Sequence, residues 1–451
     1  MTSFLTSNRL IYALIAFGMS TRLVQYLHNR SLWLDEAWLA LNFKTRDFIG
    51  ILQHLDYNQS VPPIFLLAVK ALYQVFGSSE YVLRFIPFIA SLAILLLLWR
   101  IAASLMPASI PFALVLFIGS RTFIRYGSEF KQYTSDTAIA LALIGFAITM
   151  VGVYPRRRLA QLAAAGAIAV WISHTAIFVL VGIGLVFFID GLWSKRDYLL
   201  SIVGMGAVWI VSFGLVYILF YRDGVSNSYL NTYWSFAFLQ PNLTSLFSAV
   251  LGVFAFVTSE LYLEVGVLVV ILFGFGVGLW MLPRRVSLVL LAPILPTMAA
   301  SLLHLYPFSH RLVLFMLPGV ILIVAVGLGS VWQRVYAHQK LVAAGIAVLL
   351  SGLFFIKPYV FDIAEARDAL ALVHQQDPGA HFYTDDYVYY VGSYYGGDVQ
   401  PVEALKMLTS PVWVIYDTTN AYATETYMDS LGGHVAQTFY TPGTVVRQYV
   451  P

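Results

Sequence analysis

The chain has 451 residues, of which 59% are hydrophobic, 16% aromatic and only 11% charged, and its net charge is +3. Soluble domains carry about 25% charged residues, so this composition excludes an ordinary soluble protein. The absence of cysteine excludes disulfides, thiolate metal ligands and cysteine nucleophiles. Apolar runs near the ~20 residues that a helix needs to cross a bilayer recur along the chain, and they predict an all-α polytopic membrane protein.

The apolar runs define the predicted membrane spans. The first run is interpreted as a retained span and not a signal peptide, because it shows no small-residue cleavage signature. The eleven predicted spans are 8–27, 84–104, 108–121, 134–153, 159–173, 174–192, 198–220, 263–282, 286–304, 311–331 and 340–356.

One more apolar stretch, "PPIFLLAVKALYQVFG" at 62–77, is either a twelfth span or a helix on the membrane surface. If it does not span and the N-terminus is inside, all the basic turns between spans fall in the cytoplasm; if it spans, all of them fall outside. The positive-inside rule therefore favours a surface helix. Lys70 in its middle, costly in lipid, favours the same interpretation. The basic turns are Arg156 to Arg158, Lys195-Arg196, Arg284-Arg285 and Arg334 to Lys340.

This topology puts a first outer loop, 28–83, and the more polar segment 357–451 on the same, extracytoplasmic side. In the latter, a helix predicted over 363–375 precedes two strand-like runs, "AHFYTDDYVYYVGSYY" and "PVWVIYDTT". We therefore predict two domains, a transmembrane domain over 1–356 and a small extracytoplasmic α/β domain over 357–451.

Polar residues that are scattered along the sequence converge on this one predicted membrane face. Ionisable groups at membrane depth are costly, so their convergence indicates function. A carboxylate in a partly dry cleft beside cations suits a general base, and arginine forks match phosphate oxygens. With aromatic walls that could stack on sugar rings, the set predicts group transfer from a lipid phosphate. Its members are Arg22, Asp35, Glu36, His54, Arg84, Arg125, Glu129, Lys131, Tyr133, Asp136, His174, His310 and Arg311.

Each of these residues also has a purely structural explanation. Asp35 and Glu36 could lie in a solvated turn, Arg22 could snorkel to the interface, and the tryptophans that flank the acidic pair could belong to an aromatic belt. Neighbouring residues on a helix diverge by about 100°, so Asp35 and Glu36 would not face the same target. The sequence has no phosphate-binding glycine loop, zinc spacing, nucleic-acid patch or second acidic cluster, so neither a metal or cofactor nor a nucleic-acid partner is predicted.

Four stretches occur in an order that resembles family-39-like glycosyltransferases: "SLWLDEAW", "FGSSEYVLRFIPFIASL", "RYGSEFKQYTSD" and "YPFSHRLVLFMLPGVIL". Over roughly 1–356 the chain resembles the protein O-mannosyltransferases, the aminoarabinose transferases that modify lipid A, and the bacterial RgtA/B/C/D-like enzymes. This resemblance implies the GT-C fold, an active site on the outer membrane face, a polyprenyl-phosphate-linked sugar donor and an inverting transfer.

The resemblance also implies roles for individual residues. Asp35 would be the general base, and Glu36 would orient it by pairing with Arg84. The motif of the second outer loop matches approximately and would bind the donor phosphate. Val61 departs from the family, whose members often have His or Lys directly before the prolines, and His54 is the candidate replacement. The predicted substrate-binding residues are Arg84, Arg125, Glu129, Lys131, Tyr133, His54, His174, His310 and Arg311.

The sequence thus predicts a glycosyltransferase of the cell (inner) membrane that acts on a hydroxyl or amine of a lipid, glycan or protein acceptor in the cell envelope. The main alternative is a lipid or glycan transporter or flippase without covalent chemistry. Transporters usually place ionisable residues near the bilayer midplane between internal repeats, and no repeat is visible here. A non-catalytic receptor or assembly subunit is the second alternative.

Overall fold

The computed structural model describes residues 8–258, 264–334, 365–396 and 398–451, and of residues 254–258 and 264–267 only the backbone. The chain forms two compact units. The helical unit comprises Met1–Tyr26, Ser60–Ala68 and Arg84–Tyr359, and the mixed unit comprises Leu27–Gln59, Val69–Leu83 and Val360–Pro451. The predicted span 340–356 and the predicted domain boundary at 356/357 lie outside the described residues.

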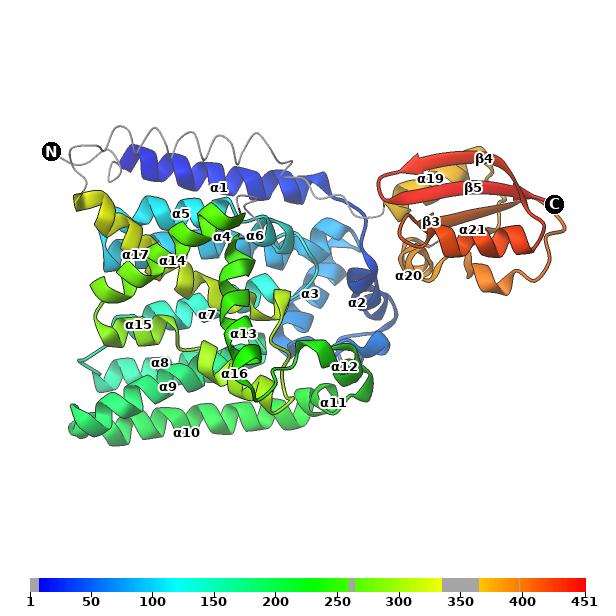
Figure 1. The fold of residues 1–451 in the computed structure, drawn as a ribbon. Helices are drawn as coiled ribbons and strands as arrows, with labels where there is room; N and C mark the ends of the chain where they lie inside the picture. Colours follow the sequence, from blue (N-terminus) through cyan, green and yellow to red (C-terminus); the bar gives the residue numbers. More distant parts are fainter. Residues whose placement is uncertain (1–7, 259–263, 335–364, 397) are drawn as a thin grey trace. The chain divides into compact units, whose positions relative to one another are not determined.

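The helices and strands follow one another along the chain in two blocks, seen in Figure 1 from blue to yellow and then from orange to red. The first block is α1 (Asn8–His28), α2 (Leu34–Thr45), α3 (Pro63–Phe76), α4 (Glu80–Leu105), α5 (Ile110–Ile118), α6 (Arg121–Tyr126), α7 (Tyr133–Ile148), α8 (Arg156–Ile172), α9 (Ala176–Trp193), α10 (Leu199–Val216), α11 (Arg222–Val225), α12 (Ser228–Tyr233), α13 (Leu243–Thr258), α14 (Glu264–Met281), α15 (Arg284–Leu290), α16 (Ile294–Leu302) and α17 (Leu317–Arg334). The second block is α19 (Ala366–Gln376), β1 (Phe382–Thr384), α20 (Asp386–Tyr395), β2 (Val399–Pro401), β3 (Val412–Asp417), α21 (Ala421–Ser430), β4 (His434–Thr441) and β5 (Thr444–Val450).

The helical unit confirms the prediction of an all-α polytopic membrane protein. Helices stand at the predicted spans in the described part of the chain. Five helical segments there are long and apolar enough to cross a membrane, and the bent pair α15–α16 makes six if it is one span. Several others, such as α5 and α7, are apolar but shorter than the ~20 residues that a straight span needs.

Two details differ from the prediction. The span predicted over 286–304 is broken into α15 and α16, which meet at a 47° bend. Pro293 begins α16, and proline cannot donate the hydrogen bond that a continuous helix would need there. The second difference is α13, which lies in a stretch predicted to be a loop. Figure 1 shows α13 running across the direction of α1 and α10.

The core of the helical unit is centred on α17, whose residues Leu317 to Val326 are all buried. α14 packs against it through glycines. A Cβ atom on Gly278 would lie 2.0 Å from the carbonyl oxygen of Ile323, and one on Gly327 would lie 1.8 Å from that of Gly274. Membrane helices gain little from burying apolar surface against each other, so they rely on such close backbone contact.

This contact gives a stability prediction with a control on the same helix. Gly278→Ala should destabilise the protein by about 1–3 kcal/mol, because the new methyl group collides with backbone that has no room to move. Gly276, two residues away, has nothing within 4 Å of its would-be Cβ. Gly276→Ala should therefore be neutral or stabilise by up to about 1 kcal/mol through helix propensity. Thermal unfolding in detergent checks both, and equal midpoints would contradict the packing argument.

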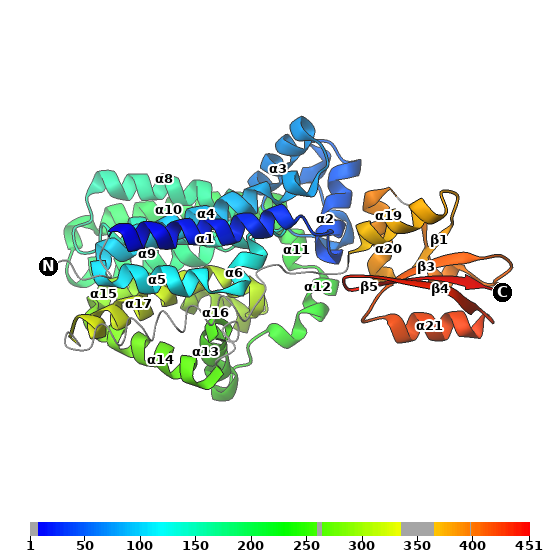
Figure 2. The ribbon, with the colours of Figure 1, turned by 90° about the horizontal axis from the view of Figure 1, so that it is seen from above.

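The mixed unit contains a five-stranded sheet in the order β2-β1-β3-β5-β4. β1, β2 and β3 are parallel, whereas β5 pairs antiparallel with both β3 and β4. All six residues of β3 are buried, as expected for a central strand that is covered on both faces. Figure 2 shows α21 on one face of the sheet and α19 and α20 on the other. The predicted α/β fold of this segment is confirmed.

One element of this segment was predicted wrongly. The run "DYVYYVGSYY" forms the helix α20 and not a strand. Asp385 caps its first turn by accepting a hydrogen bond from the Val388 N–H, at 2.8 Å. Gly396 ends it in the left-handed conformation, with φ of 86°. These two caps outweigh the strand propensity of the tyrosines and valines between them.

The stretch predicted to be a surface helix is α3, which begins at Pro63. Lys70 in its middle is buried, at 2% exposure, and is not left in an apolar environment. Its Nζ donates a hydrogen bond to the carbonyl oxygen of Phe43 in α2, at 2.8 Å, and lies 5.2 Å from the centre of the Tyr73 ring. Lys70 therefore serves to hold α2 and α3 together within the mixed unit.

Candidate functional site

The acidic pair lies in the first turn of α2, in the mixed unit. Glu36 is completely buried, and its Oε2 accepts a hydrogen bond from Nη1 of the equally buried Arg30 at 2.9 Å. The same oxygen accepts from the Trp33 N–H at 3.3 Å, which is the return half of a capping box. Glu36 thus has two partners from the segment just before its own helix.

Asp35 differs from its neighbour because it is only half-buried. The helix turns Asp35 and Glu36 to different sides, and only Glu36 is enclosed. Asp35 is therefore the carboxylate of the pair that a substrate can reach. No group of three or more metal-ligating side chains occurs among the described residues.

An aromatic group lies one helical turn after Asp35. It consists of Trp38 from α2, Tyr57 from the following loop and Tyr390 from α20. The Trp38 and Tyr57 rings are nearly parallel, with centroids 6.5 Å apart, and the Tyr390 ring stands edge-on to both, at 5.8 and 5.2 Å. Tyr57 remains 38% exposed. The group therefore offers an accessible aromatic surface beside the acidic pair.

The backbone of the loop is strained at Tyr57. Tyr57 and Asn58 both adopt left-handed backbone conformations, with φ of 60° and 53°, which bulky side chains disfavour. Contacts from α2 impose this geometry. Asn42 accepts from the Asp56 N–H at 2.9 Å, and Arg46 forms an ion pair with Asp56 at 2.9 Å. Such locally strained residues are typical of functional sites.

His54 stands at the start of this loop. Its side chain is exposed, while its carbonyl oxygen accepts a hydrogen bond from Arg46 at 2.7 Å. His54 therefore helps to fix the loop through its backbone, and its imidazole is exposed.

The second predicted cluster lies in the helical unit, around α6 and the start of α7. Arg125 approaches the fully buried Glu129 at 3.7 Å. The Arg311 guanidinium lies 5.5 Å from the centre of the Tyr133 ring and 5.8 Å from that of Trp234. The Tyr126 ring packs edge-on against the Tyr133 ring, with their centroids 5.5 Å apart. The structure thus brings Arg125, Glu129, Tyr133 and Arg311 together and adds Tyr126 and Trp234 to them.

Electrostatics in this cluster keep Tyr126 protonated. Burial, reinforced by the carboxylate of Glu129, raises the pKa of the Tyr126 phenol to about 12, although Arg125 and Arg311 oppose the shift. Because the phenol is neutral, Tyr126 adds no negative charge, and the Glu129 carboxylate faces the two guanidinium groups of Arg125 and Arg311. The cluster therefore has an excess of positive charge, which suits an anionic ligand such as a phosphate.

His174 lies between α8 and α9, beside Tyr221, with their rings edge-on and their centroids 4.3 Å apart. Its neighbour Ser173 shares a hydrogen bond with the Thr175 hydroxyl, with the two oxygens 3.2 Å apart. His310 has a left-handed backbone, with φ of 42°, and its ring contacts the Ser309 hydroxyl. The imidazole of His310 is exposed.

The remaining predicted cations are buried in the helical unit. Arg84, near the start of α4, is 2% exposed, and Lys131 is 5% exposed. Arg22 does not snorkel to an interface: it is 1% exposed, donates to the Ser91 hydroxyl at 2.9 Å and to the Phe117 carbonyl at 3.2 Å, and lies 4.1 Å from the Phe117 ring. Neutral hydrogen-bond acceptors and an aromatic ring thus take the place of water around its guanidinium inside the bundle.

Sequence reasoning missed Arg30, Tyr57, Tyr126, Trp234 and Tyr390. Arg30 had a signal, since a basic residue six positions before a glutamate in the first turn of a helix can reach it. The four aromatic residues had none, because aromatic residues are common throughout this chain.

Comparison with known proteins adds evidence on the fold. No protein-family model and no curated protein matches the sequence. Among solved structures, the chain is similar to ArnT from Cupriavidus metallidurans in the apo state, with a TM-score of 0.54 and 13% sequence identity over 97% of both chains. A second structure, of ArnT from the same organism bound to undecaprenyl phosphate, matches with a TM-score of 0.44 and 14% identity over 98% of both chains.

The likeness to apo ArnT extends over 97% of both chains. It confirms the GT-C architecture that the sequence motifs predicted, a multi-pass membrane protein with a small C-terminal α/β part. At this level of identity the comparison establishes the fold.

Proposed function

We propose that the chain is an integral membrane glycosyltransferase that transfers a sugar from a polyprenyl-phosphate donor to a hydroxyl or amine of an acceptor, with inversion at the anomeric carbon. The observation that carries the proposal is the ArnT-like GT-C fold over 97% of both chains, on which the predicted acidic pair and cation cluster both occur. In this proposal the protein lies in the cell (inner) membrane and acts on its outer face.

Asp35 is the proposed general base. It is supported in this role because it is the accessible member of the pair, while Glu36 is enclosed and held by Arg30. The acceptor transfers its proton to the Asp35 carboxylate as its oxygen or nitrogen forms a bond to the anomeric carbon. The bond between that carbon and the phosphate oxygen breaks, and the polyprenyl phosphate leaves with the electron pair.

The cations of the helical unit have the complementary role. Arg84, Arg125, Lys131 and Arg311 are proposed to bind the donor phosphate and to stabilise the negative charge that grows on it as it departs. Such preorganised charge acts most strongly where water is excluded, and Arg84 and Lys131 are both buried. Glu129 and Tyr133 orient the guanidinium groups beside them. His54, His174 and His310 remain proposed contacts to substrate.

The aromatic group of Trp38, Tyr57 and Tyr390 is proposed to bind the acceptor. Aromatic faces bind the apolar faces of ring-shaped ligands, and this group lies one turn of α2 from Asp35.

The first test replaces the proposed base. Asp35→Asn should lower transfer by about 10²–10⁴-fold, because the amide cannot accept the acceptor proton, while expression and the unfolding midpoint stay unchanged. Mass spectrometry of lipid and glycan pools from cells with and without the protein identifies the product, and the variant is then assayed for that product. Asp429→Asn, an exposed aspartate of α21, is the control. Unchanged turnover in Asp35→Asn would refute the assignment, and substrate movement without covalent change would favour a flippase.

The second test addresses the phosphate site. Arg311→Gln should weaken binding of undecaprenyl phosphate by at least about tenfold, since a hydrogen bond to a charged group contributes about 1.5–3 kcal/mol. Arg311→Lys should retain part of the affinity, because it keeps the charge and loses the fork. Arg222→Gln, at an exposed arginine of α11, is the control for net charge. Binding is measured by native mass spectrometry, and equal affinities of the Arg311→Gln and Arg222→Gln variants would exclude Arg311 from the site.

The third test uses the strained backbone at Tyr57. Tyr57→Gly removes the ring and also relieves the left-handed strain, so the unfolding midpoint should stay constant or rise. The KM for the acceptor should nevertheless rise by about tenfold, or 1.4 kcal/mol of binding, with the KM for the donor unchanged. Tyr422→Ala, at an exposed tyrosine of α21, controls for loss of a surface ring. An unchanged acceptor KM would show that Tyr57 does not contact the acceptor.

A further inference from the structure

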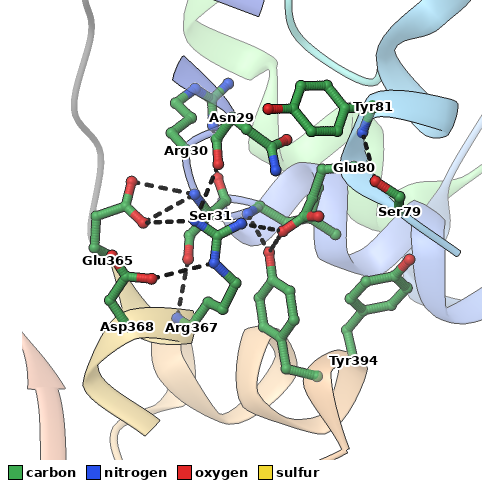
Figure 3. Close-up of polar contacts among 12 residues, drawn as sticks. Asn29, Arg30, Ser31, Ser79, Glu80, Tyr81, Glu365, Arg367, Asp368 and Tyr394 are labelled. Carbon is green, nitrogen blue, oxygen red and sulfur yellow. Dashed lines mark hydrogen bonds and ion pairs between the residues drawn. The ribbon is translucent and has the colours of Figure 1, made fainter. Parts of the chain in front are cut away.

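The segment between α1 and α2, residues 29–33, has no regular secondary structure, yet its backbone is held at several points by side chains from more than 300 residues away. Both carboxylate oxygens of Glu365 accept from the Ser31 N–H, at 3.1 and 3.0 Å. The Leu32 N–H donates to the Tyr395 hydroxyl at 2.9 Å. The Asn29 carbonyl oxygen accepts from Nη2 of Arg367 at 3.0 Å. Figure 3 shows the contacts that Glu365 and Arg367 make with the segment around Ser31.

The hold is reciprocal. The Ser31 hydroxyl accepts a hydrogen bond from the Arg367 backbone N–H at 2.9 Å, in the first turn of α19. The first N–H groups of a helix need such partners, and the residue that precedes α19, Glu365, does not cap the helix with its own side chain. The two segments thus stabilise each other. The Ser31 hydroxyl caps the first turn of α19, and the carboxylate of Glu365, just before α19, binds the Ser31 N–H.

A second layer of charge fixes the side chains that make these contacts. Arg367 forms an ion pair with Glu80 at 2.6 Å and another with Asp368 at 3.2 Å. The same oxygen of Glu80 accepts from the Tyr395 hydroxyl at 2.8 Å. Because the Tyr395 hydroxyl donates to Glu80 and accepts from the Leu32 N–H, its proton direction is fixed. The network therefore closes on itself, as Figure 3 shows around Arg367 and Glu80.

The held segment leads directly into the acidic pair. Arg30 donates from one nitrogen both to the Ser31 carbonyl oxygen, at 3.0 Å, and to Glu36, at 2.9 Å. The Trp33 N–H donates to the same oxygen of Glu36. A shift of Ser31 or Leu32 would therefore move both partners of Glu36, and with them the first turn of α2 that carries Asp35.

We propose that Glu365, Arg367 and Tyr395 form a clamp through which the C-terminal α/β part positions the acidic pair. The clamp residues are positioning residues and not catalytic ones, because their contacts are with the 29–33 backbone. The clamp should order the first turn of α2, and this consequence is independent of the proposed function. Its effect on turnover, in contrast, rests on the proposed function. The proposal assigns the C-terminal part a role in turnover beyond simple attachment.

Hydrogen–deuterium exchange on the full-length protein in detergent tests the mechanical consequence. Tyr395→Phe removes only the hydroxyl that accepts from Leu32, and Glu365→Gln removes the charge that faces Ser31. In both variants the amides of residues 31–32 should exchange at least about tenfold faster, and the rise should extend to the amides of Glu36 and Ala37. Glu403→Gln, at an exposed glutamate of the same part, is the matched control and should change nothing.

The buried strand β3 reports on unfolding in the same experiment. Faster exchange at residues 412–417 in Glu365→Gln would mean that this variant has lost its fold, and Tyr395→Phe and Ser31→Ala then decide the question. Exchange at wild-type rates over residues 29–37 would overturn the clamp. A rise in exchange that is confined to residues 31–32 would show that the clamp attaches the 29–33 segment but does not position the acidic pair.

Turnover separates the clamp from the proposed chemistry. With the transfer assay in hand, Tyr395→Phe should lower kcat by about tenfold and leave the KM for the donor lipid unchanged. Unchanged kcat with faster exchange would overturn the positioning role. If the wild-type protein shows no transfer at all, the proposed function fails, and the exchange at Glu36 and Ala37 still decides whether the clamp orders the first turn of α2.

Discussion

The ion pair between Arg30 and Glu36 is the interaction on which the proposed chemistry depends. Both side chains are removed from water, and removing water from a charge costs several kcal/mol unless a partner lies at hydrogen-bond distance. Arg30 meets this condition and also binds the Ser31 carbonyl oxygen, so one guanidinium joins the loop to the helix. Because Glu36 is enclosed in this way, the two adjacent carboxylates differ in accessibility, and Asp35 is the one that a substrate can reach.

The same constraint recurs at three other buried charges in the described part of the chain. Arg22 is held by Ser91 and the Phe117 carbonyl, and Lys70 by the Phe43 carbonyl. Asp190 is held by Arg285 at 2.7 Å and by the Tyr154 hydroxyl at 2.7 Å. Except for the Tyr154 hydroxyl, which comes from the segment between α7 and α8, each contact joins two helices that apolar packing alone would not fix in register, since lipid-facing surfaces gain little from association. Buried charge therefore specifies the arrangement of this fold as well as its candidate site.

Much of the fold could be predicted because hydrophobic periodicity and length act locally. The apolar runs located the long helices, and the interior lysine of 62–77 favoured a surface helix over a twelfth span. The failures have local causes too. In "DYVYYVGSYY" strand propensity concealed a helix whose ends are set by Asp385 and Gly396, and these capping residues were readable in the sequence. α13 was missed because an apolar run of moderate length was assigned to a loop.

The candidate site was predictable only where its partners are close in sequence or where the predicted topology places them at the same membrane face. Arg125 and Glu129 are four residues apart, and Arg311 was found because the predicted topology puts it on the same side as they are. The partners of Ser31 are not of this kind. Nothing at positions 365 and 367 indicates a role 334 to 336 residues earlier, because a glutamate and an arginine at the start of a helix are ordinary surface residues. Long-range polar contacts have no periodicity, so a single sequence does not reveal them.

The C-terminal sheet explains how these contacts can be firm. β3 is buried along its whole length, and Asp385 ties the start of α20 to the end of β3 by accepting from the Asp417 N–H and from Asn420, both at 3.0 Å. α20 is thus fixed at its N-cap residue to the fully buried central strand of the sheet, and it ends at Tyr395. It supplies Tyr390 to the aromatic group and Tyr395 to the clamp. One helix, supported by one strand, therefore sets the position of both the proposed acceptor surface and the loop that leads to Asp35, which is how a rigid scaffold gives precision to residues carried on a loop.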